Sequence, residues 1–350
     1  AEASEPAPLP EGVRAELRPY QLEGYRWMMR LAACGAGGCL ADDMGLGKTL
    51  QSLAVLAARS SLGPALVVAP TSVTVNWPSE AARFVPGLTF LSYRGPARHE
   101  LLERLGPDVV LVTSYDILLR DIERLAPVGF ATAVFDEAHA LKNAQAKRSA
   151  AVRRIQADVR FALSGTPIEN HTGELWSLFR IVVPGLFGSW ERFRERFAAP
   201  IERDRDPARR AALAAVVRPY LLRRTKSEVA PELPPRTELV RFVDLSPPER
   251  ELYEAERLRA IASTRAAAGS AGRAGGPGGD GGDGRFAVLA ALTRLRQLAC
   301  HPRLRDPAST VASTKLRSVL DLIDELKDAG HRALVFSQFT THLEIVAQAL

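Results

Sequence analysis

The sequence predicts an α/β fold in which helices cover both faces of a parallel sheet. Between residues 40 and 170, short apolar runs alternate with segments of helical periodicity, and each run ends in polar residues, Gly or Pro. Repetition of strand, loop and helix is typical of such a sheet, whose ligands bind at the carboxyl ends of its strands. The apolar runs are ALVVAP (65–70), DVVLVTSY (108–115), TAVFDEAH (132–139) and RFALSGTP (160–167).

The composition is that of a globular protein with an anionic partner. Hydrophobic residues make up 46% of the 350 residues, and no apolar run approaches the ~18–20 residues that span a bilayer. The proline-rich start AEASEPAPLP lacks the basic and apolar segments of a signal peptide, and the three cysteines form no paired framework. The net charge of +6 favours an anionic partner. We expect a monomer with no membrane partner, in the cytoplasm (nucleoid) of a bacterium or the nucleus of a eukaryote.

Changes in composition along the chain predict four parts. The Gly-rich stretch at 266–284 buries too little apolar surface to order itself, so we expect a flexible loop there. The apolar run RALVFSQF (332–339) predicts one more strand. The first residue is not Met and the last stretch has a helical pattern, so we expect both ends to be cut from a longer chain. The four parts are 1–15 (disordered tail), 16–225 (α/β lobe with a helical protrusion from about 174), 226–310 (helical insertion with the Gly-rich loop) and 311–350 (incomplete start of a second α/β lobe).

The segment CLADDMGLGKTLQS (39–52) predicts a phosphate-binding loop. It follows the weak apolar run GGCLA and precedes a helical pattern, so its backbone N–H groups would form an anion-binding nest at a helix N-terminus. Lys48 would reach the β- and γ-phosphates, and the Thr49 hydroxyl would bind Mg²⁺. The general pattern G-x-x-x-x-G-K-S/T has a glycine where this sequence has Asp42. The alternative is an ordinary Gly-rich turn before a core helix.

The segment VFDEAH (134–139) supports the nucleotide interpretation. It is an apolar strand that ends in an Asp-Glu pair downstream of the loop. Asp136 would hold the metal through water, and Glu137 would orient and deprotonate the attacking water. An Asp-Glu pair alone is a common polar strand end. Together with Gly47-Lys48-Thr49 in this order, it predicts a Mg²⁺-nucleotide site.

With these segments the chain resembles the Swi/Snf-type helicase-like ATPases of the superfamily-two helicases. The resemblance covers nearly the whole chain beyond residue 15, in order, and the acidic residue at Asp42 is typical of that family's own loop. The family loop reads Asp-Glu where this chain has Asp42-Asp43. The matching segments are LRPYQLEGYRWM (17–28), ADDMGLGKT (41–49), LVVAPTSVTVNW (66–77), LVTSYDILLRD (111–121), VFDEAHALKN (134–143), ALSGTPIEN (162–170), LRRTKSEVAPELPP (222–235), LRQLACHP (295–302) and ALVFSQF (333–339).

The resemblance implies a RecA-like P-loop NTPase lobe, a helical insertion and a truncated second RecA-like lobe, with ATP and Mg²⁺ as cofactors. It implies catalytic roles for Lys48, Asp136, Glu137, Ser164 and Thr166. It implies nucleotide contacts from Arg18, Gln21 (to the adenine edge), Asp43, Met44, Gly45, Leu46, Gly47, Lys48, Thr49 and Leu50. It implies nucleic-acid contacts from Pro70, Thr71, Asn76, Trp77, Ser114, Tyr115 and Lys142, and Mg²⁺ ligation by Thr49 and Asp136.

Several of these residues keep a second interpretation. Ser164 and Thr166 would sense the γ-phosphate through Asp136 or Glu137, or would serve only in a turn or helix cap. We expect the Trp77 indole to pack in or beside the core and not against bases, although it lies in a matched segment. His139 would couple the nucleotide and nucleic-acid sites, or would be a satisfied semi-buried histidine. Of the arginines and lysines between 192 and 226, we expect Arg223, Arg224 and Lys226 to belong to a basic track beside the duplex, because they lie in a matched segment.

The activity that the resemblance implies is ATP hydrolysis coupled to movement on double-stranded DNA, with remodelling or displacement of DNA-bound protein such as RNA polymerase or nucleosome-like complexes. Hydrolysis in such enzymes needs an arginine finger, worth ~10³–10⁵ in rate, from the second lobe. We therefore expect residues 1–350 to bind ATP weakly and to hydrolyse it slowly, with little stimulation by DNA. Two alternatives remain: a partner-docking module with vestigial catalysis, and an RNA-directed ATPase of the same superfamily.

Overall fold

The computed structural model describes residues 7–141, 147–165, 171–229, 237–271 and 282–350. Contacts divide the chain into two compact units, Ala1–Pro235 and Arg236–Leu350. In the described part no helix has the length and apolar character needed to cross a membrane.

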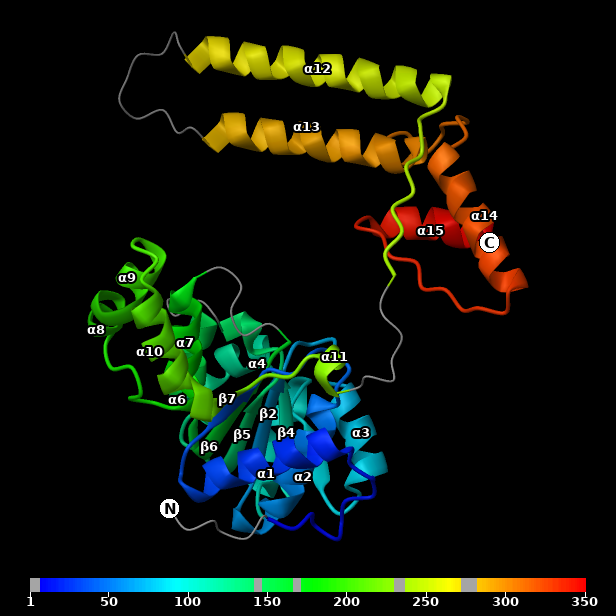
Figure 1. Cartoon of the computed structure of the whole chain (residues 1–350). Coiled ribbons are helices and arrows are strands. Elements are labelled where there is room, and N and C mark those ends of the chain that lie inside the picture. Colours follow the sequence, from blue (N-terminus) through cyan, green and yellow to red (C-terminus); the bar gives the residue numbers. More distant parts are fainter. Residues whose placement is uncertain (1–6, 142–146, 166–170, 230–236, 272–281) are drawn as a thin grey trace. The chain divides into compact units, whose positions relative to one another are not determined.

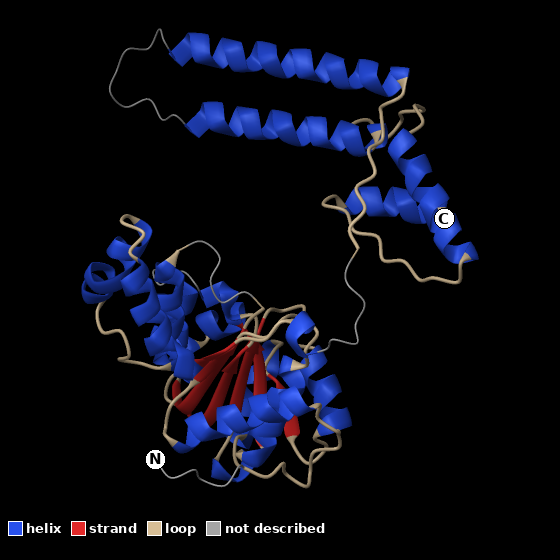
Figure 2. Ribbon diagram, viewed as in Figure 1, coloured by secondary structure: helices blue, strands red, loops and turns tan. Residues whose placement is uncertain are grey.

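The first unit is built on a seven-stranded sheet in which every pairing is parallel (Figure 2). Its spatial order is β3-β4-β2-β5-β6-β1-β7, so the chain crosses over between most strands, as the repeated strand–helix pattern predicts. The strands are β1 (Gly38–Leu40), β2 (Ala65–Ala69), β3 (Thr89–Ser92), β4 (Val109–Ser114), β5 (Gly129–Phe135), β6 (Gln156–Leu163) and β7 (Leu221–Leu222).

Helices cover both faces of the sheet, because successive residues of the central strands point to opposite sides. In β2, Leu66 and Val68 join the core cluster that includes α4, α6 and α7, whereas Val67 joins the cluster that includes α1, α2 and α3. Figure 1 shows α1 and α2 lying across the sheet. The predicted fold class is therefore confirmed. The helices on the two faces are α1 (Pro19–Ala33), α2 (Lys48–Ala58), α3 (Asn76–Phe84), α4 (Tyr115–Arg120), α5 (Ile122–Leu125), α6 (Lys147–Arg154) and α7 (Thr172–Val182).

A group of short helices follows α7, where the sequence predicts a helical protrusion. Aromatic side chains hold it together, with the rings of Phe187 and Phe193 at 4.9 Å and those of Phe193 and Phe197 at 5.7 Å between centroids. The helices are α8 (Trp190–Phe193), a π-helical turn (Arg194–Ala198), α9 (Ala199–Glu202), α10 (Pro207–Val217) and, after β7, α11 (Lys226–Val229).

The N-terminal segment is more ordered than predicted where it is described. Tyr25 Oη donates to the Pro8 carbonyl at 2.7 Å, and the Arg14 backbone N–H donates to the Phe84 carbonyl at 2.7 Å. Residues 7–15 therefore pack on the lobe, and the expectation of a disordered tail is wrong for them. Residues 1–6 lie outside the described residues.

The second unit, described by itself, is helical. Helices α12 (Pro247–Ala271) and α13 (Gly282–Cys300) run side by side, and Arg294 Nε lies 2.5 Å from Glu256 Oε1 (Figure 1). Both helices extend into the stretch expected to be a flexible loop, of which 272–281 lie outside the described residues. Helices α14 (Thr314–Asp328) and α15 (Thr340–Ala349) follow.

The strand predicted at 332–339 is absent from the described second unit. Its residues have no regular structure, and Leu334 and Phe336 are each 86% exposed. A β-strand is stable only when neighbouring strands satisfy its backbone groups, and the described residues of this unit supply none. The expectation of a second α/β lobe that starts at 311 therefore stays a prediction.

Candidate nucleotide and DNA-binding site

The polar residues singled out in the sequence converge at the carboxyl edge of the sheet. The Ser164 N–H donates to the Leu40 carbonyl at 3.1 Å, which places the end of β6 beside the start of the loop. The Asp136 N–H donates to the Val68 carbonyl at 2.8 Å, which places the end of β5 beside the end of β2. Four segments that are far apart in the sequence thus end at one edge, where ligands of such sheets bind.

The predicted phosphate loop has the backbone that an anion nest requires. Gly45 and Gly47 have φ values of 86° and 75°, in the left-handed region that favours glycine, and Gly47 is the N-cap of α2. Lys48 begins that helix, and its Nζ donates to the carbonyls of Asp42 at 2.7 Å and Asp43 at 3.2 Å. Burial lowers the pKa of Lys48, and the nearby carboxylates, Glu137 foremost, partly oppose this. The ammonium group therefore lies over its own loop, at the helix N-terminus.

Asp136 is held on three sides. The Trp77 indole Nε1 donates to its Oδ2 at 3.0 Å, the Glu137 N–H donates to its Oδ1 at 2.9 Å, and Tyr115 Oη donates to its carbonyl at 2.7 Å. Burial raises the pKa of Asp136, whereas the bonds from Trp77 and Glu137 lower it. The carboxylate is thus fixed in orientation but costly to ionise, which suits a group that functions beside a cation.

Glu137 has a backbone conformation that is rare for its residue type. Its φ is 46°, in the left-handed region, where a non-glycine residue costs ~1–3 kcal/mol. Its carboxylate is 26% exposed, and Oε2 lies 3.2 Å from His139 Nδ1. The His139 side chain is 49% exposed, so the alternative interpretation of His139 as a satisfied semi-buried histidine is wrong. The Glu137 carboxylate therefore lies beside His139 of the 3₁₀ turn Ala138–Leu141 that follows the strand.

Gln21 packs on the phosphate loop from α1. Its Oε1 accepts from the Arg18 N–H at 3.0 Å, and its Nε2 donates to the Leu46 carbonyl at 3.2 Å. A Cβ at Gly47 would lie 2.4 Å from Gln21 Nε2, so glycine is needed there for space as well as for φ. The implied adenine contact of Gln21 and the implied nucleotide contacts of Arg18 and Met44 stay predictions.

The Asp42 carboxylate is paired inside the lobe. It is fully buried and accepts a two-pronged bond from Arg224, with Nε to Oδ1 at 3.0 Å and Nη2 to Oδ2 at 2.6 Å. Arg224 is only 8% exposed. The expectation that Arg224 belongs to a surface track beside DNA is therefore wrong, because its guanidinium is buried and bonded to Asp42 inside the lobe. Arg223 and Lys226 are exposed, as such a track requires.

The implied nucleic-acid contacts fall into two classes. Thr71 and Asn76 are exposed and Pro70 is half-buried, so they are available to a partner. Trp77 and Tyr115 are 1% and 3% exposed, and both bond Asp136, so their side chains are not surface contacts. For Trp77 this confirms the expected packing in the core.

Ser114 and its surroundings add a feature that the sequence did not reveal. Ser114 caps α4 by accepting from the Ile117 N–H at 3.3 Å. It also lines a pocket of about 70 Å³ together with Thr71, Ser92 and Arg94, at the carboxyl ends of β2, β3 and β4. Arg94 was missed because β3 is a short edge strand without an apolar run. Lys142 and Thr166 lie outside the described residues.

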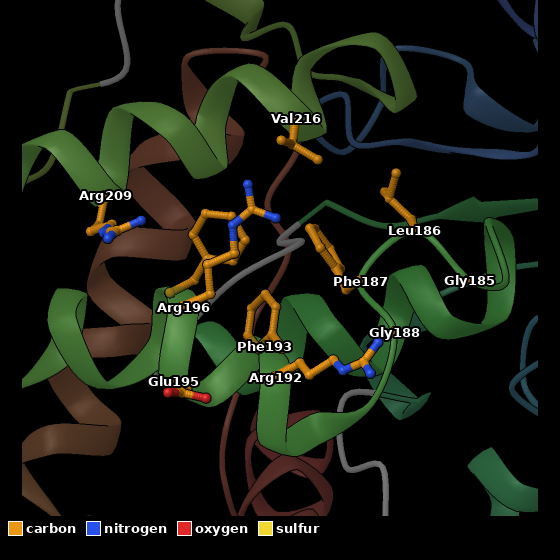
Figure 3. Close-up of a pocket in the computed structure, with 11 residues that line it drawn as sticks. Gly185, Leu186, Phe187, Gly188, Arg192, Phe193, Glu195, Arg196, Arg209 and Val216 are labelled. Carbon is orange, nitrogen blue, oxygen red and sulfur yellow. The ribbon is translucent and has the colours of Figure 1, made fainter.

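Three arginines of the protrusion surround a separate hollow. Arg192, Arg196 and Arg209 line a cavity of about 810 Å³ with Phe187 and Phe193 at its floor (Figure 3). Glu195 also lies on its rim. These arginines are exposed.

A magnesium site fits the chemistry of the residues present. The described residues contain no group of three or more His, Cys, Asp or Glu side chains that would cage a metal ion. Mg²⁺ bound with a nucleotide needs only one or two protein oxygens, because phosphates and water supply the rest. Asp136 presents a carboxylate whose Oδ1 and Oδ2 each accept one bond and keep further lone pairs. Thr49 and Asp136 therefore remain the predicted ligands.

Comparison with known proteins agrees with this geometry. Residues 20–304 match the family described as the SNF2-related domain. The chain is 37% identical over 341 residues to the putative ATP-dependent helicase/translocase YwqA of Bacillus subtilis, which covers 93% of this chain and 36% of that protein. It is 32% identical over 402 residues to the TATA-binding protein-associated factor mot1 of Aspergillus fumigatus, covering 97% of this chain and 21% of that protein. The chain thus spans about a third or less of these relatives.

A solved structure also resembles the chain. The Sulfolobus solfataricus SWI2/SNF2 ATPase core in complex with dsDNA is 35% identical, with a TM-score of 0.62, covering 99% of this chain and 71% of that one. The match in sequence and in fold confirms the Swi/Snf resemblance and the RecA-like α/β architecture. The chain belongs to the SNF2-related family of helicase-like ATPases.

Proposed function

We propose that this protein hydrolyses ATP with Mg²⁺ to move along double-stranded DNA and to remodel or displace proteins bound there. The observation that carries the proposal is the convergence of the phosphate loop, Asp136 and Glu137 at one edge of the sheet. Lys48 Nζ at the N-terminus of α2 and the two carboxylates after β5 are the groups that phosphoryl transfer needs.

The chain's own residues divide the work of hydrolysis. The N–H groups at the start of α2 bind the phosphates, and Lys48 exchanges the Asp42 and Asp43 carbonyls for phosphate oxygens. Glu137 orients the attacking water and accepts its proton. Mg²⁺, when bound, neutralises charge that develops on the phosphates. Ser164 is buried, and its N–H donates to the Leu40 carbonyl at the start of the loop. From this position Ser164 would sense the γ-phosphate through Asp136 or Glu137.

Coupling to DNA runs through the segment that follows β2. Thr71 and Asn76 are exposed on it, and its last residue in the matched motif, Trp77, bonds the Asp136 carboxylate. A change at the nucleotide is thus transmitted through Trp77 to exposed residues that would contact DNA phosphates. Such contacts position a DNA strand without reading its sequence. The net charge of +6 also suits a DNA partner.

The relatives suggest which partners to test. One related structure is a complex with dsDNA, and other relatives are named as TATA-binding protein-associated factors or as helicase SWR1. DNA-bound assemblies such as RNA polymerase or nucleosome-like complexes are therefore the proposed targets. Such an enzyme would work where DNA is, in the bacterial nucleoid or the eukaryotic nucleus. A docking module with vestigial catalysis is disfavoured, because Lys48, Asp136 and Glu137 keep an ordered arrangement.

The test compares ATP turnover by the full-length protein with duplex DNA, single-stranded DNA and RNA. The proposal predicts that duplex DNA stimulates most and that Lys48→Ala abolishes turnover. Greater stimulation by RNA would favour the RNA-directed alternative, and unchanged biological activity of the Lys48→Ala variant would favour the docking module. For residues 1–350 alone, we expect slow hydrolysis with little stimulation.

A further inference from the structure

A short segment from the far end of the first unit runs alongside the phosphate loop. We call residues 221–226 the clamp segment. Its strand β7 pairs with β1, with Leu222 beside Leu40. The bonding continues past the strand: the Ala41 N–H donates to the Leu222 carbonyl at 2.6 Å, and the Asp43 N–H donates to the Arg224 carbonyl at 3.0 Å. The first half of the loop is therefore held as if it were a strand neighbour.

The Arg224 side chain joins three elements around the nucleotide site. Besides its two bonds to Asp42 in the loop, Nη2 donates to Gln51 Oε1 of α2 at 3.1 Å. Nη1 donates to the Tyr20 carbonyl of α1, and the guanidinium carbon lies 5.4 Å from the centroid of the Tyr20 ring. A planar guanidinium presents its donors in a fixed fork, so these contacts fix the relative positions of loop, α1 and α2.

The network reaches the part of the loop that would touch phosphate. Gln51 Nε2 donates to the carbonyls of Leu46 and Gly47, at 3.4 Å and 3.3 Å. The backbone of Asp42, whose side chain Arg224 holds, supplies the carbonyl on which Lys48 Nζ rests. Arg224 thus contacts Lys48 indirectly through Asp42, and it contacts the Gly47 N-cap indirectly through Gln51.

The network occupies the space beside Gly24 of α1 and contains a fully buried carboxylate. A Cβ at Gly24 of α1 would lie 1.9 Å from Gln51 Oε1 and 2.8 Å from Arg224 Nη2. Asp42 has no exposed surface, so its carboxylate has no water to replace a lost partner. Removing one member of a buried ion pair leaves an uncompensated charge, which drives a local rearrangement. Such a rearrangement would move the phosphate loop itself.

The position of Arg224 in the chain gives this contact a second consequence. The clamp segment leads through α11 to residue 229, and the second unit begins at Arg236. A pull on the chain from that side reaches the clamp segment through α11. We propose that Arg224 is a positioning residue of the nucleotide site, through which the order of the clamp segment and the affinity of the phosphate loop depend on each other. The proposal rests on the proposed function, since it requires a nucleotide to bind at this loop.

The test titrates Mg²⁺ and the fluorescent nucleotide mant-ADP into residues 1–350. Arg224→Gln is expected to weaken binding by about 10- to 100-fold, the usual range of coupling between sites. Arg218→Gln is the matched control, because Arg218 is an exposed arginine just before β7, and it is expected to bind within about twofold of the wild type. The double variant Asp42→Asn, Arg224→Gln removes both charges and is expected to recover part of the affinity.

Hydrogen exchange supplies a readout that a merely structural role would not move. Because coupling is reciprocal, mant-ADP is expected to slow exchange of the amides of 221–229 in the wild type and in Arg218→Gln, but not in Arg224→Gln. If Arg224→Gln does not fold, Arg224→Lys keeps the charge without the fork and is expected to show the same loss to a smaller degree.

The outcomes separate this inference from the proposed function. Wild-type affinity in Arg224→Gln or Arg224→Lys, or unchanged protection of 221–229, overturns the inference alone. If the wild type binds mant-ADP no more tightly than Lys48→Ala, both the proposed function and the inference are overturned.

Discussion

The Trp77 indole donates a hydrogen bond to Asp136 Oδ2 over 3.0 Å, across 59 residues of sequence. Trp77 ends a segment whose exposed residues are predicted to touch DNA, and Asp136 is the carboxylate predicted to hold Mg²⁺. A residue expected to pack in or beside the core is therefore also the donor that orients the carboxylate predicted to hold Mg²⁺.

This relationship predicts a pH effect for Trp77→Phe. Mg²⁺-nucleotide binding requires the Asp136 carboxylate, so affinity falls as the pH drops through its raised pKa. The hydrogen bond from the indole lowers the pKa of Asp136, so its loss should move the acid midpoint of binding to a higher pH. Mant-ADP affinity measured across pH checks this. Trp27→Phe is the control, because Trp27 Nε1 donates to the Pro219 carbonyl at 3.0 Å and not to Asp136. An unchanged midpoint in Trp77→Phe would show that the bond does not tune the carboxylate.

The same raised pKa predicts how the stability of the nucleotide-free protein depends on pH. The folded state binds the Asp136 proton more tightly than the unfolded chain, so this contribution to stability is present below the unfolded pKa. It is lost as the pH rises through the folded pKa. Urea denaturation of wild type and Asp136→Asn at several pH values checks the sign, since the variant lacks this titration. A contribution from Asp136 that grows with pH would contradict the assignment.

The pocket beside Ser114 predicts a DNA contact at Arg94. Arg94→Gln should weaken duplex DNA binding and reduce the slope of log affinity against log salt by about 1, as expected for one lost phosphate contact. Arg104→Gln is the control, because Arg104 is also exposed but precedes β4 instead of following a strand. Tyr115→Phe should leave DNA affinity unchanged, because the Tyr115 hydroxyl bonds the Asp136 carbonyl inside the lobe. Equal salt slopes for Arg94→Gln and the wild type would exclude the contact.

Close packing around Arg224 predicts that Gly24 tolerates no side chain. In Gly24→Ala the new methyl group would meet Gln51 Oε1 at 1.9 Å, and overpacking of this kind costs ~1–3 kcal/mol. Thermal unfolding should show the loss, and nucleotide affinity should fall with it. Gly12→Ala offers the contrast, since a Cβ at Gly12 meets nothing within 4 Å. Equal melting temperatures for the two variants would mean that the network rearranges freely.

The sequence predicted the central sheet well, because its buried strands are continuous apolar runs. The runs at 65–70, 108–115, 132–139 and 160–167 became β2, β4, β5 and β6. Edge strands were harder: β3 alternates in burial and β7 has two residues, so neither leaves an apolar run. The strand predicted from the apolar run at 332–339 did not form in the described second unit. An apolar run forms a stable strand only beside a neighbouring strand.

The site was predicted where it depends on local motifs and missed where it depends on distant partners. The order of the loop and the Asp-Glu pair is visible in the sequence, and the structure brings them to one edge. The role of Arg224 was not visible, because its partner Asp42 lies 182 residues away and a buried arginine looks like a surface one in sequence. Trp77 shows the same limit, since its core packing was expected but its acceptor was not.

We propose above that residues 41–49 and the carboxylates after β5 form one nucleotide site. Calorimetric titration of residues 1–350 with Mg²⁺ and a slowly hydrolysed ATP analogue measures this binding, with Lys48→Ala and Glu137→Gln as variants. We expect the wild type and Glu137→Gln to bind, because Glu137 acts on water, and Lys48→Ala to lose at least ~10-fold in affinity without a lower melting temperature. Equal affinity of Lys48→Ala and the wild type would contradict it.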